Sequence, residues 1–411
     1  MARYSYPFCC LLLLLFTVRA TAQSGGFVMP PGQRQVEIPF EYYNNFILIK
    51  VTFNRVFPLV FILDTGAEYT ILCKREISDL MQVTYEKEFK IAGSDLTSEL
   101  TAYLARGIRF DLGEKMTAPS EDILVLDDDY FKFEEYAGVN IDGIMTANVF
   151  AKYVMKINYQ RALITLYRRD YFRPENGFSE IPLEIYRNKP YYNTRLQILR
   201  DTTVPVKLLI DTGAALPLLL FSDSHPLLNP PSGSIPSQIG MGLGGFLEGF
   251  AGRIFQMQVG PYSQNNAISY FQKLDTLLNK PYLNNRNGLL GNGILARYTV
   301  VLDYQQAKMW LKPIKKYNQP FIFDRSGIHV IATGVHLRNF IIQNVLPNSP
   351  AAEAGIQKGD EIVMVGFSPA SFLSLDDLMK TFHKSPGKKI KLTIKRDGKK
   401  IKKILVLRDI L

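Results

Sequence analysis

The sequence predicts a mainly β protein made of two homologous lobes followed by a small α+β module. Two stretches of about 140 residues repeat one another at a nearly constant offset. Within them the apolar runs are short, rich in β-branched and aromatic residues, and bounded by turn residues, as strands are. After Pro313 the repeat stops, and a different order of turns, helix starts and basic residues begins.

The N-terminal segment is typical of an export signal. Arg3 precedes an apolar run over residues 8–18, and Ala20-Thr21-Ala22 follows it, which fits the small-x-small rule for signal cleavage. We expect residues 1–22 to be removed and the mature chain to be periplasmic or extracellular. A membrane anchor is the alternative, although the run is short for a span of the hydrocarbon core.

Composition narrows the class of protein. A hydrophobic content of 47% in 411 residues suffices for large cores, so two or three domains are expected. Only Cys73 remains after signal cleavage, so no intramolecular disulfide is expected.

The formal charge is +10, and residues 325–411 hold 15 Lys/Arg and 7 Asp/Glu, a net of 15 − 7 = +8. Alternating basic and apolar residues around Asp397-Gly398 predict a hairpin with one solvated face, and attraction to anionic lipid or nucleic acid is the alternative.

The duplication defines the two lobes. The matched segments include Ile38-Pro39-Phe40-Glu41 with Ile181-Pro182-Leu183-Glu184, Asp64-Thr65-Gly66-Ala67 with Asp211-Thr212-Gly213-Ala214, and Phe150-Ala151-Lys152-Tyr153 with Leu295-Ala296-Arg297-Tyr298. Their offsets are 143, 147 and 145, so only small insertions separate the copies. We therefore expect a first lobe over residues 23–170, a second over residues 171–315 with a linker over residues 168–179, and the C-terminal module over residues 316–411.

The paired Asp-Thr-Gly triplets point to a single site. Each follows an apolar run, so each aspartate is placed where a buried strand turns, and a buried carboxylate is costly unless it is hydrogen-bonded or used. Two carboxylates facing across a pseudo-twofold axis share a proton, so one can take a proton from water while the other protonates a scissile carbonyl oxygen. The glycine allows close backbone approach, and the threonine hydroxyl can bond across to the other lobe. The candidate catalytic residues are Asp64 and Asp211, supported by Thr65, Gly66, Thr212 and Gly213.

This chemistry requires no metal and no cofactor, and none is predicted. The alternative is structural, with each aspartate merely closing a turn.

Residues 36–313 resemble the pepsin/retropepsin class of aspartic peptidases. The resemblance implies a bilobal β fold, a substrate cleft between the lobes and a β-hairpin flap, for which residues 91–113 and the glycine-rich residues 239–260 are the candidates. A plain glycine-rich loop is the alternative for the second. The class has a hydrophobic-hydrophobic-Gly segment downstream of each active loop, which we match to Leu289-Leu290-Gly291 and, in the first lobe, to Ile141-Asp142-Gly143.

The residue after each triplet bears on the pH optimum. Pepsins usually carry serine or threonine there, whose hydroxyl bonds a catalytic carboxylate, whereas retropepsins carry alanine, as Ala67 and Ala214 do here. Fewer hydrogen bonds to the ionised form remove a cause of pKa depression. We expect a mildly acidic to near-neutral optimum.

The C-terminal module resembles a PDZ domain of the bacterial type. The resemblance rests on residues 344–362, in which a helix begins at Pro350 and stops at Gly355, and on a second helix capped by Ser374. It implies binding of an extended peptide, commonly its C-terminus, as an added strand. Ser326, Gly327 and Ile328 are the candidate carboxylate loop, and a plain linker is the alternative.

These observations favour an exported aspartic endopeptidase whose PDZ module recruits peptides or substrates. The rival hypothesis is a catalytically silent, peptidase-like scaffold that binds envelope partners through the module. The expected partners are polypeptide substrates and, at the module, peptide or protein C-termini. We expect no nucleic acid partner, no membrane span after signal cleavage, and a monomer.

Overall fold

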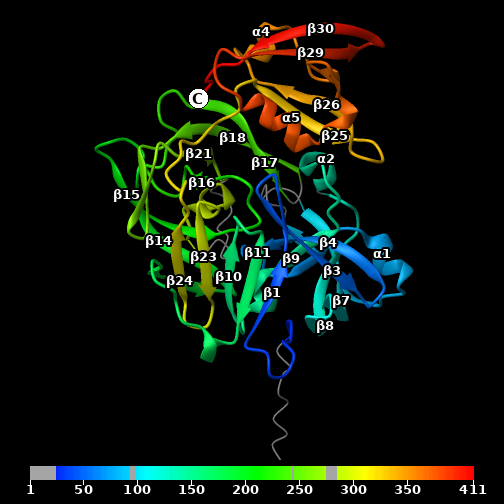
Figure 1. The fold of residues 1–411 in the computed structure, drawn as a ribbon, viewed down its shortest axis with the longest axis vertical. Helices are drawn as coiled ribbons and strands as arrows, with labels where there is room; N and C mark the ends of the chain where they lie inside the picture. Colours follow the sequence, from blue (N-terminus) through cyan, green and yellow to red (C-terminus); the bar gives the residue numbers. More distant parts are fainter. Residues whose placement is uncertain (1–24, 93–98, 131, 243–244, 275–284) are drawn as a thin grey trace, which may run out of the picture.

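The computed structural model describes residues 25–92, 99–130, 132–242, 245–274 and 285–411, so the predicted signal peptide lies outside the described residues. The protein is mainly β, which confirms the predicted fold class. In the part of the chain that the structure describes, the strands form four sheets: one in each lobe, one shared between the lobes and one in the C-terminal module (Figure 1).

The first lobe is built on a sheet of strand order β2-β3-β4-β9-β5-β8-β7-β6. Its elements are β2 (Glu41–Tyr43), β3 (Phe46–Phe53), β4 (Phe57–Asp64), β5 (Thr70–Leu72), α1 (Arg75–Leu80), β6 (Tyr85–Ala92), β7 (Glu99–Leu112), β8 (Met116–Leu126), α2 (Phe133–Ala137), β9 (Gly143–Thr146) and the 3-10 turn η1 (Ala147–Phe150). Strand β9 lies parallel to β4 in the interior of this sheet, and both strands are mostly apolar.

The second lobe repeats this arrangement in the order β17-β18-β21-β16-β22-β15-β14-β19-β20, with β13 paired to β14. Its elements are β13 (Glu184–Tyr186), β14 (Lys189–Gln197), β15 (Thr203–Ile210), β16 (Leu218–Phe221), β17 (Ile235–Gly242), β18 (Gly245–Arg253), β19 (Gln256–Val259), β20 (Tyr262–Asn265), β21 (Ile268–Gln272), β22 (Gly288–Leu290) and α3 (Asn292–Leu295). Here β22 lies parallel to β15, as β9 lies to β4.

The shared sheet joins the lobes and carries their symmetry. Its strand order is β1-β11-β10-β23-β24-β12, in which β10 and β23 pair antiparallel at the centre. The strands are β1 (Gln35–Pro39), β10 (Val154–Asn158), β11 (Leu163–Tyr167), β12 (Ser179–Pro182), β23 (Tyr298–Asp303) and β24 (Lys308–Pro313), with the 3-10 turn η2 (Arg169–Tyr171) in the predicted linker. Because each half of the sheet contains equivalent strands of the two copies, the sequence repeat becomes a pseudo-twofold axis between β10 and β23.

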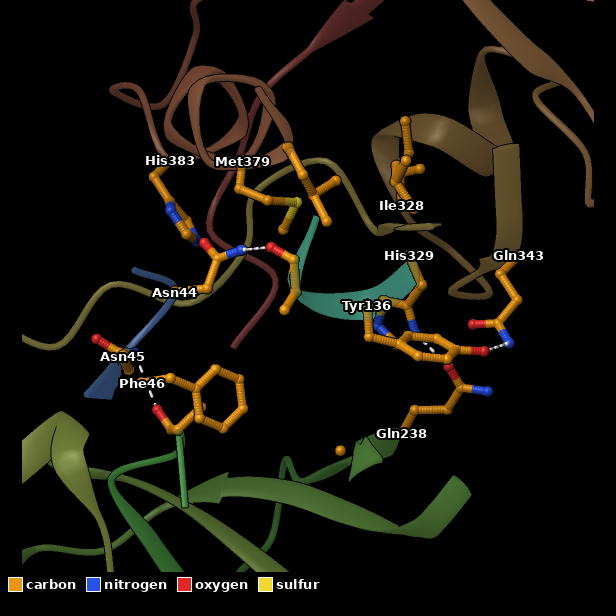
Figure 2. A pocket seen from close by; sticks show the side chains of 15 residues that line it. Asn44, Asn45, Phe46, Tyr136, Gln238, Ile328, His329, Gln343, Met379 and His383 are labelled. Atoms are coloured by element: carbon orange, nitrogen blue, oxygen red, sulfur yellow. Dashed lines mark hydrogen bonds between the residues drawn. The ribbon is translucent and has the colours of Figure 1, made fainter. Parts of the chain in front are cut away.

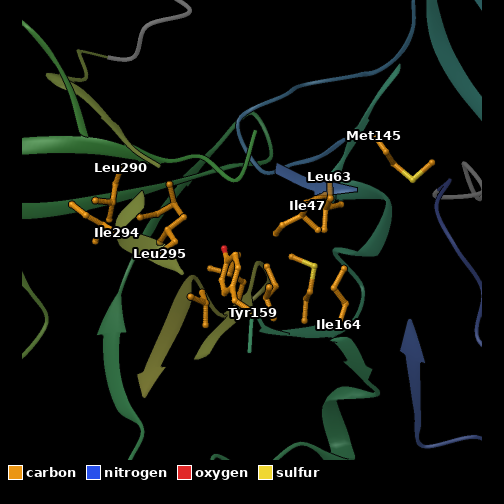
Figure 3. Packing of buried hydrophobic residues seen from close by; sticks show 14 of the residues in the cluster. Ile47, Leu63, Met145, Tyr159, Ile164, Leu290, Ile294 and Leu295 are labelled. Carbon is orange, nitrogen blue, oxygen red and sulfur yellow. The ribbon is translucent and has the colours of Figure 1, made fainter. Parts of the chain in front are cut away.

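The main core runs through both lobes and this sheet. Figure 3 shows Leu63 and Ile47 of the first lobe on one side and Leu290 and Leu295 of the second lobe on the other, with Tyr159 between them. The lobes are therefore held by a common apolar interior.

The strand register corrects one match made from sequence. Gly143 pairs with Phe61 in the first lobe, and Gly288 pairs with Leu208 in the second, so Gly143 is the counterpart of Gly288. The first-lobe counterpart of Leu289-Leu290-Gly291 is thus Ile144-Met145-Thr146, and the match to Ile141-Asp142-Gly143 was wrong. The buried Asp142 has a different task, since its Oδ2 accepts a hydrogen bond from the Val60 amide at 2.8 Å and fixes β4.

The C-terminal module has its own core and a sheet of order β25-β26-β27-β29-β30. Its elements are β25 (Ile328–Thr333), β26 (Asn339–Val345), α4 (Pro350–Glu353), β27 (Glu361–Val365), β28 (Ser368–Pro369), η4 (Ala370–Phe372), α5 (Leu375–Phe382), β29 (Lys389–Arg396) and β30 (Lys399–Val406). The predicted starts at Pro350 and Ser374 are confirmed, and Ser374 forms a capping box with Asp377. The basic segment forms the β29–β30 hairpin that turns at Asp397-Gly398, as predicted.

The module lies against both lobes, above β17 and α2 (Figure 1). Among the described residues, no helix is long and apolar enough to cross a membrane.

Candidate active site

Asp64 and Asp211 occupy equivalent positions in the two lobes. Asp64 is the last residue of β4, and Asp211 directly follows β15. Both side chains are partly exposed, whereas Thr65 and Thr212 next to them are buried. Each aspartate thus leaves a buried strand at the junction of the lobes.

Hydrogen bonds between the lobes hold the two loops together. The Thr65 amide donates to Thr212 Oγ1 at 3.1 Å, and the Thr212 amide donates to Thr65 Oγ1 at 3.0 Å. Thr65 Oγ1 also donates to the Ile210 carbonyl at 2.6 Å. Thr212 Oγ1 donates to the Leu63 carbonyl at 2.8 Å. Because buried groups of this kind are costly to leave unpaired, the reciprocal pattern fixes the spacing of the two loops.

The glycines of the triplets make room for the carboxylates. A Cβ on Gly66 would lie 2.9 Å from Asp211 Cγ, and a Cβ on Gly213 would meet the Asp64 carboxylate still more closely. Each glycine therefore packs against the carboxylate of the opposite lobe, which is the contact that a side chain would prevent. The two aspartates face each other across the lobe junction.

Backbone amides orient the carboxylates. Asp64 Oδ1 accepts hydrogen bonds from the Gly66 amide at 2.5 Å and the Ala67 amide at 3.0 Å. Asp211 Oδ1 accepts one from the Gly213 amide at 2.9 Å. These bonds favour the ionised forms, but other effects outweigh them.

The two carboxyl groups have different environments. Burial and the facing Asp211 carboxylate raise the pKa of Asp64 well above its usual range. Burial also raises the pKa of Asp211, but the positive charge of Arg286 opposes this. Because both pKa values are raised and the two carboxyl groups face each other, the pair can hold one proton between them.

Sequence reasoning missed Arg286, which precedes β22 in an asparagine-rich run and belongs to no motif. A second missed residue is Tyr304, the repeat counterpart of Tyr159. Its hydroxyl is buried without a hydrogen-bond partner among the described residues, and both burial and Asp64 raise its pKa. By contrast, the Tyr159 hydroxyl donates to Asn292 at 2.8 Å. The repeat alignment pairs the two tyrosines but does not reveal their position next to the dyad.

The two flap candidates fall in antiparallel hairpins. Residues 91–113 overlap the paired strands β6 and β7, and residues 93–98 lie outside the described residues. Residues 239–260 contain most of the β17–β18 hairpin, in which Gly242 pairs with Gly245.

The candidate carboxylate loop lies in the module, away from the dyad in the sequence and at the start of β25. Ser326 and Gly327 precede the strand, and Ile328 is its first residue. The Ser326 and Gly327 amides donate to Asp324 Oδ1 at 3.0 and 2.5 Å.

Comparison with known proteins identifies the module. A family model of the PDZ domain matches residues 324–404. Among solved structures, the chain is similar to an aspartic proteinase from Irpex lacteus, with 11% sequence identity, a TM-score of 0.44, and coverage of 69% of this chain and 99% of that one. It is also similar to a photosystem II D1 C-terminal processing protease, with 20% identity, a TM-score of 0.20, and coverage of 21% and 23% of the two chains. The family match shows that the chain carries a PDZ domain at residues 324–404.

Proposed function

We propose that the chain is an exported aspartic endopeptidase that hydrolyses peptide bonds with a water activated between Asp64 and Asp211. The observation that carries the proposal is the pair of facing carboxyl groups, set by the reciprocal Thr65–Thr212 hydrogen bonds and given raised pKa values by burial. A pair of this kind, at the junction of two lobes, can supply an acid and a base to one substrate.

The positive charge of Arg286 assigns the roles. Asp211 is the base, because Arg286 favours its ionised form, and Asp64 is the acid. Water attacks the scissile carbonyl carbon and gives a proton to Asp211, while the proton of Asp64 moves to the carbonyl oxygen. The resulting gem-diol collapses when the C–N bond breaks. Asp211 then returns its proton to the leaving amine, and Asp64 recovers one from the diol.

The rest of the chain serves this reaction. The N-terminal sequence supports export to the periplasm or outside, and the division into residues 23–170, 171–315 and 316–411 gives two catalytic lobes and a recruiting module. We propose that the PDZ domain holds polypeptide substrates, because PDZ folds bind extended peptides by strand addition. The enzyme acts as a monomer, since both aspartates come from one chain.

The test uses purified protein from Gln23 onward and a mixture of peptides, with cleavage followed by mass spectrometry. Asp64→Asn and Asp211→Asn each keep the side-chain shape but remove the acid or base, so kcat should fall by at least about 100-fold. A pepstatin-type inhibitor should block the wild type. Asp201→Asn, in an exposed turn, is the matched control and should cleave normally. Cleavage that survives either dyad substitution would refute the proposal, and peptide binding without any cleavage would favour the scaffold.

A further inference from the structure

A cavity of about 350 Å³ lies between the PDZ domain and the two lobes (Figure 2). The module contributes an apolar wall that includes Ile328, Val330 and Met379, and the lobes contribute Phe46 and Ala215. The residues that line it include no Lys, Arg, Asp or Glu. Its other lining residues include the polar Asn45, Gln238 and Gln343, so this module cavity is suited to an uncharged segment that presents apolar groups.

The position of the cavity relative to the dyad follows from the pseudo-twofold axis. Ala215 lines the module cavity and follows Asp211 by four residues. Its counterpart Glu68 follows Asp64 by four residues and lines a second cavity of about 760 Å³. Asn45 and Asn188, in equivalent turns between β2 and β3 and between β13 and β14, also line the two cavities respectively. The pseudo-twofold axis thus relates the two cavities, one beside the loop that follows Asp211 and the other beside the loop that follows Asp64.

Hydrogen bonds tie the cavity wall to the catalytic loop. Asn45 Nδ2 donates to the Ala215 carbonyl at 2.9 Å, a contact drawn in Figure 2. Asn292 Nδ2 donates both to the Asn45 carbonyl at 2.7 Å and to the Thr212 carbonyl at 2.6 Å. These bonds connect the lobe side of the cavity wall to the loop that carries Asp211.

The module side of the cavity is the groove between β25 and α5. β25 is the edge strand of its sheet, and the pair of an edge strand and a helix is where PDZ folds add a peptide strand. Two contacts orient this groove toward the lobes. Gln343 Nε2 donates to the Tyr136 hydroxyl of α2 at 2.7 Å, and His329 Nδ1 lies 3.0 Å from Gln238 Oε1 of β17. The groove therefore faces α2 of the first lobe and β17 of the second.

The loop that would take a C-terminal carboxylate is already engaged. The Ser326 and Gly327 amides both donate to Asp324 Oδ1, and the Ile328 amide donates to Ser326 Oγ at 3.0 Å. A second carboxylate brought here would have to displace the Asp324 carboxyl group from these amides. The adjacent Arg325 is paired with Asp409 at 2.7 Å. The amides of this loop and the Arg325 side chain therefore already have partners, and a C-terminal carboxylate would have to compete with them.

We propose that the module cavity binds an internal, apolar segment of the polypeptide substrate, and not its free C-terminus. The substrate assignment rests on the proposed peptidase function, whereas the choice of an internal segment rests on the groove alone. The bound segment adds to β25 as a strand and continues across the dyad, so recruitment by the PDZ domain and positioning for cleavage are one event.

Binding is tested on the full chain carrying Asp211→Asn, which keeps the groove and removes cleavage. Two libraries of random decapeptides are displayed, one with the decapeptide inside a longer chain and one ending in a free carboxylate. We expect the internal library to yield apolar sequences. Each is then synthesised with a free and an amidated C-terminus, and the two Kd values should agree within about threefold, a difference under 1 kcal/mol. Ligands from the carboxylate library alone, ligands from neither library, or a loss of tenfold or more on amidation would overturn the proposal.

A pair of matched variants places the binding site. Met379→Lys puts a charge into the apolar cavity, and we expect it to weaken binding at least about tenfold. Ile404→Lys makes the same kind of change at an exposed position of β30 and should bind as the parent does. Equal binding by the two variants would overturn the assignment to this cavity.

The substrate claim has its own readout. Joined to a cleavable reporter, a selected segment should lower the KM of the otherwise wild-type enzyme at unchanged kcat, and Met379→Lys should abolish this effect. An unchanged KM in a cleaving enzyme would show that the bound peptide is not substrate. If the wild type binds the peptides and cleaves nothing, the peptidase function fails while the internal-segment binding stands.

Discussion

The reciprocal hydrogen bonds of Thr65 and Thr212 predict how much stability the protein loses when one hydroxyl is removed. Thr212→Val keeps the shape of the side chain but removes its hydroxyl. The Thr65 amide loses its acceptor and the Leu63 carbonyl loses its donor, and both are buried at the lobe junction. Leaving one buried polar group unpaired costs about 1–3 kcal/mol, so the two together should cost about 2–6 kcal/mol.

The assay is equilibrium unfolding in urea followed by tryptophan fluorescence. The single tryptophan, Trp310, is buried in β24 of the sheet that the lobes share, so it reports on the lobe junction. At about 2–4 °C per kcal/mol, the melting temperature should also fall by at least about 4 °C.

Thr299→Val is the matched control. Thr299 lies in β23, the strand next to β24, which carries Trp310. It is partly exposed and has no side-chain hydrogen bond among the described residues. Its replacement should change stability by less than about 0.5 kcal/mol. If Thr212→Val were as stable as this control, the hydrogen bonds between the lobes could not be what sets the dyad.

Further predictions concern the dyad and the module. Gly213→Ala should lower kcat by at least about 100-fold in a folded protein, because the new Cβ displaces the Asp64 carboxylate; a kcat within threefold of wild type would contradict this. Arg286→Met removes the charge that lowers the pKa of Asp211, so Asp211 stays protonated to higher pH and the acid limb of the kcat/KM profile should move upward; an unmoved limb would refute the role of Arg286. Because burial raises both dyad pKa values, the wild-type optimum should be mildly acidic to near-neutral, and a maximum below about pH 3 would count against it. Ser374→Ala should lower the stability of α5 by about 0.5–2 kcal/mol, seen as faster amide exchange in that helix; unchanged exchange would show that the cap contributes nothing.

The fold class could be predicted from the sequence because the chain contains two copies of one segment, which can be aligned with each other. Each lobe repeats the order of strands around its Asp-Thr-Gly triplet, so matched segments predicted both a pseudo-twofold axis and the meeting of Asp64 with Asp211. Local signals also predicted the module well, since the capping box at Ser374 and the turn at Asp397-Gly398 depend on neighbouring residues alone.

Register was harder to predict than fold. The match of Ile141-Asp142-Gly143 failed because β9 pairs with β4 across a separation of about 80 residues, and small insertions between them shift the alignment. Asp142 is buried because its carboxylate accepts a hydrogen bond from the Val60 amide, a tertiary contact that a local sequence pattern does not predict.

The environment of the dyad depends on contacts that a linear sequence does not display. Arg286 and Tyr304 lie far from Asp64 in the chain, and only the folded lobes bring them near the two carboxylates. The orientation of the PDZ groove is likewise set by single side-chain contacts, such as that of Gln343 with Tyr136. The sequence therefore identified the parts of the site, while their electrostatics and the direction of the groove required the structure.

The most direct test of the central claim is the rate of peptide cleavage by wild type, Asp64→Asn, Asp211→Asn and the Asp201→Asn control, measured across pH. If water is activated between the two carboxylates, the wild type and the control cleave at equal rates, and each dyad variant loses at least about 100-fold in kcat at every pH. A dyad variant that cleaves at the wild-type rate would show that the facing aspartates are not the catalytic groups.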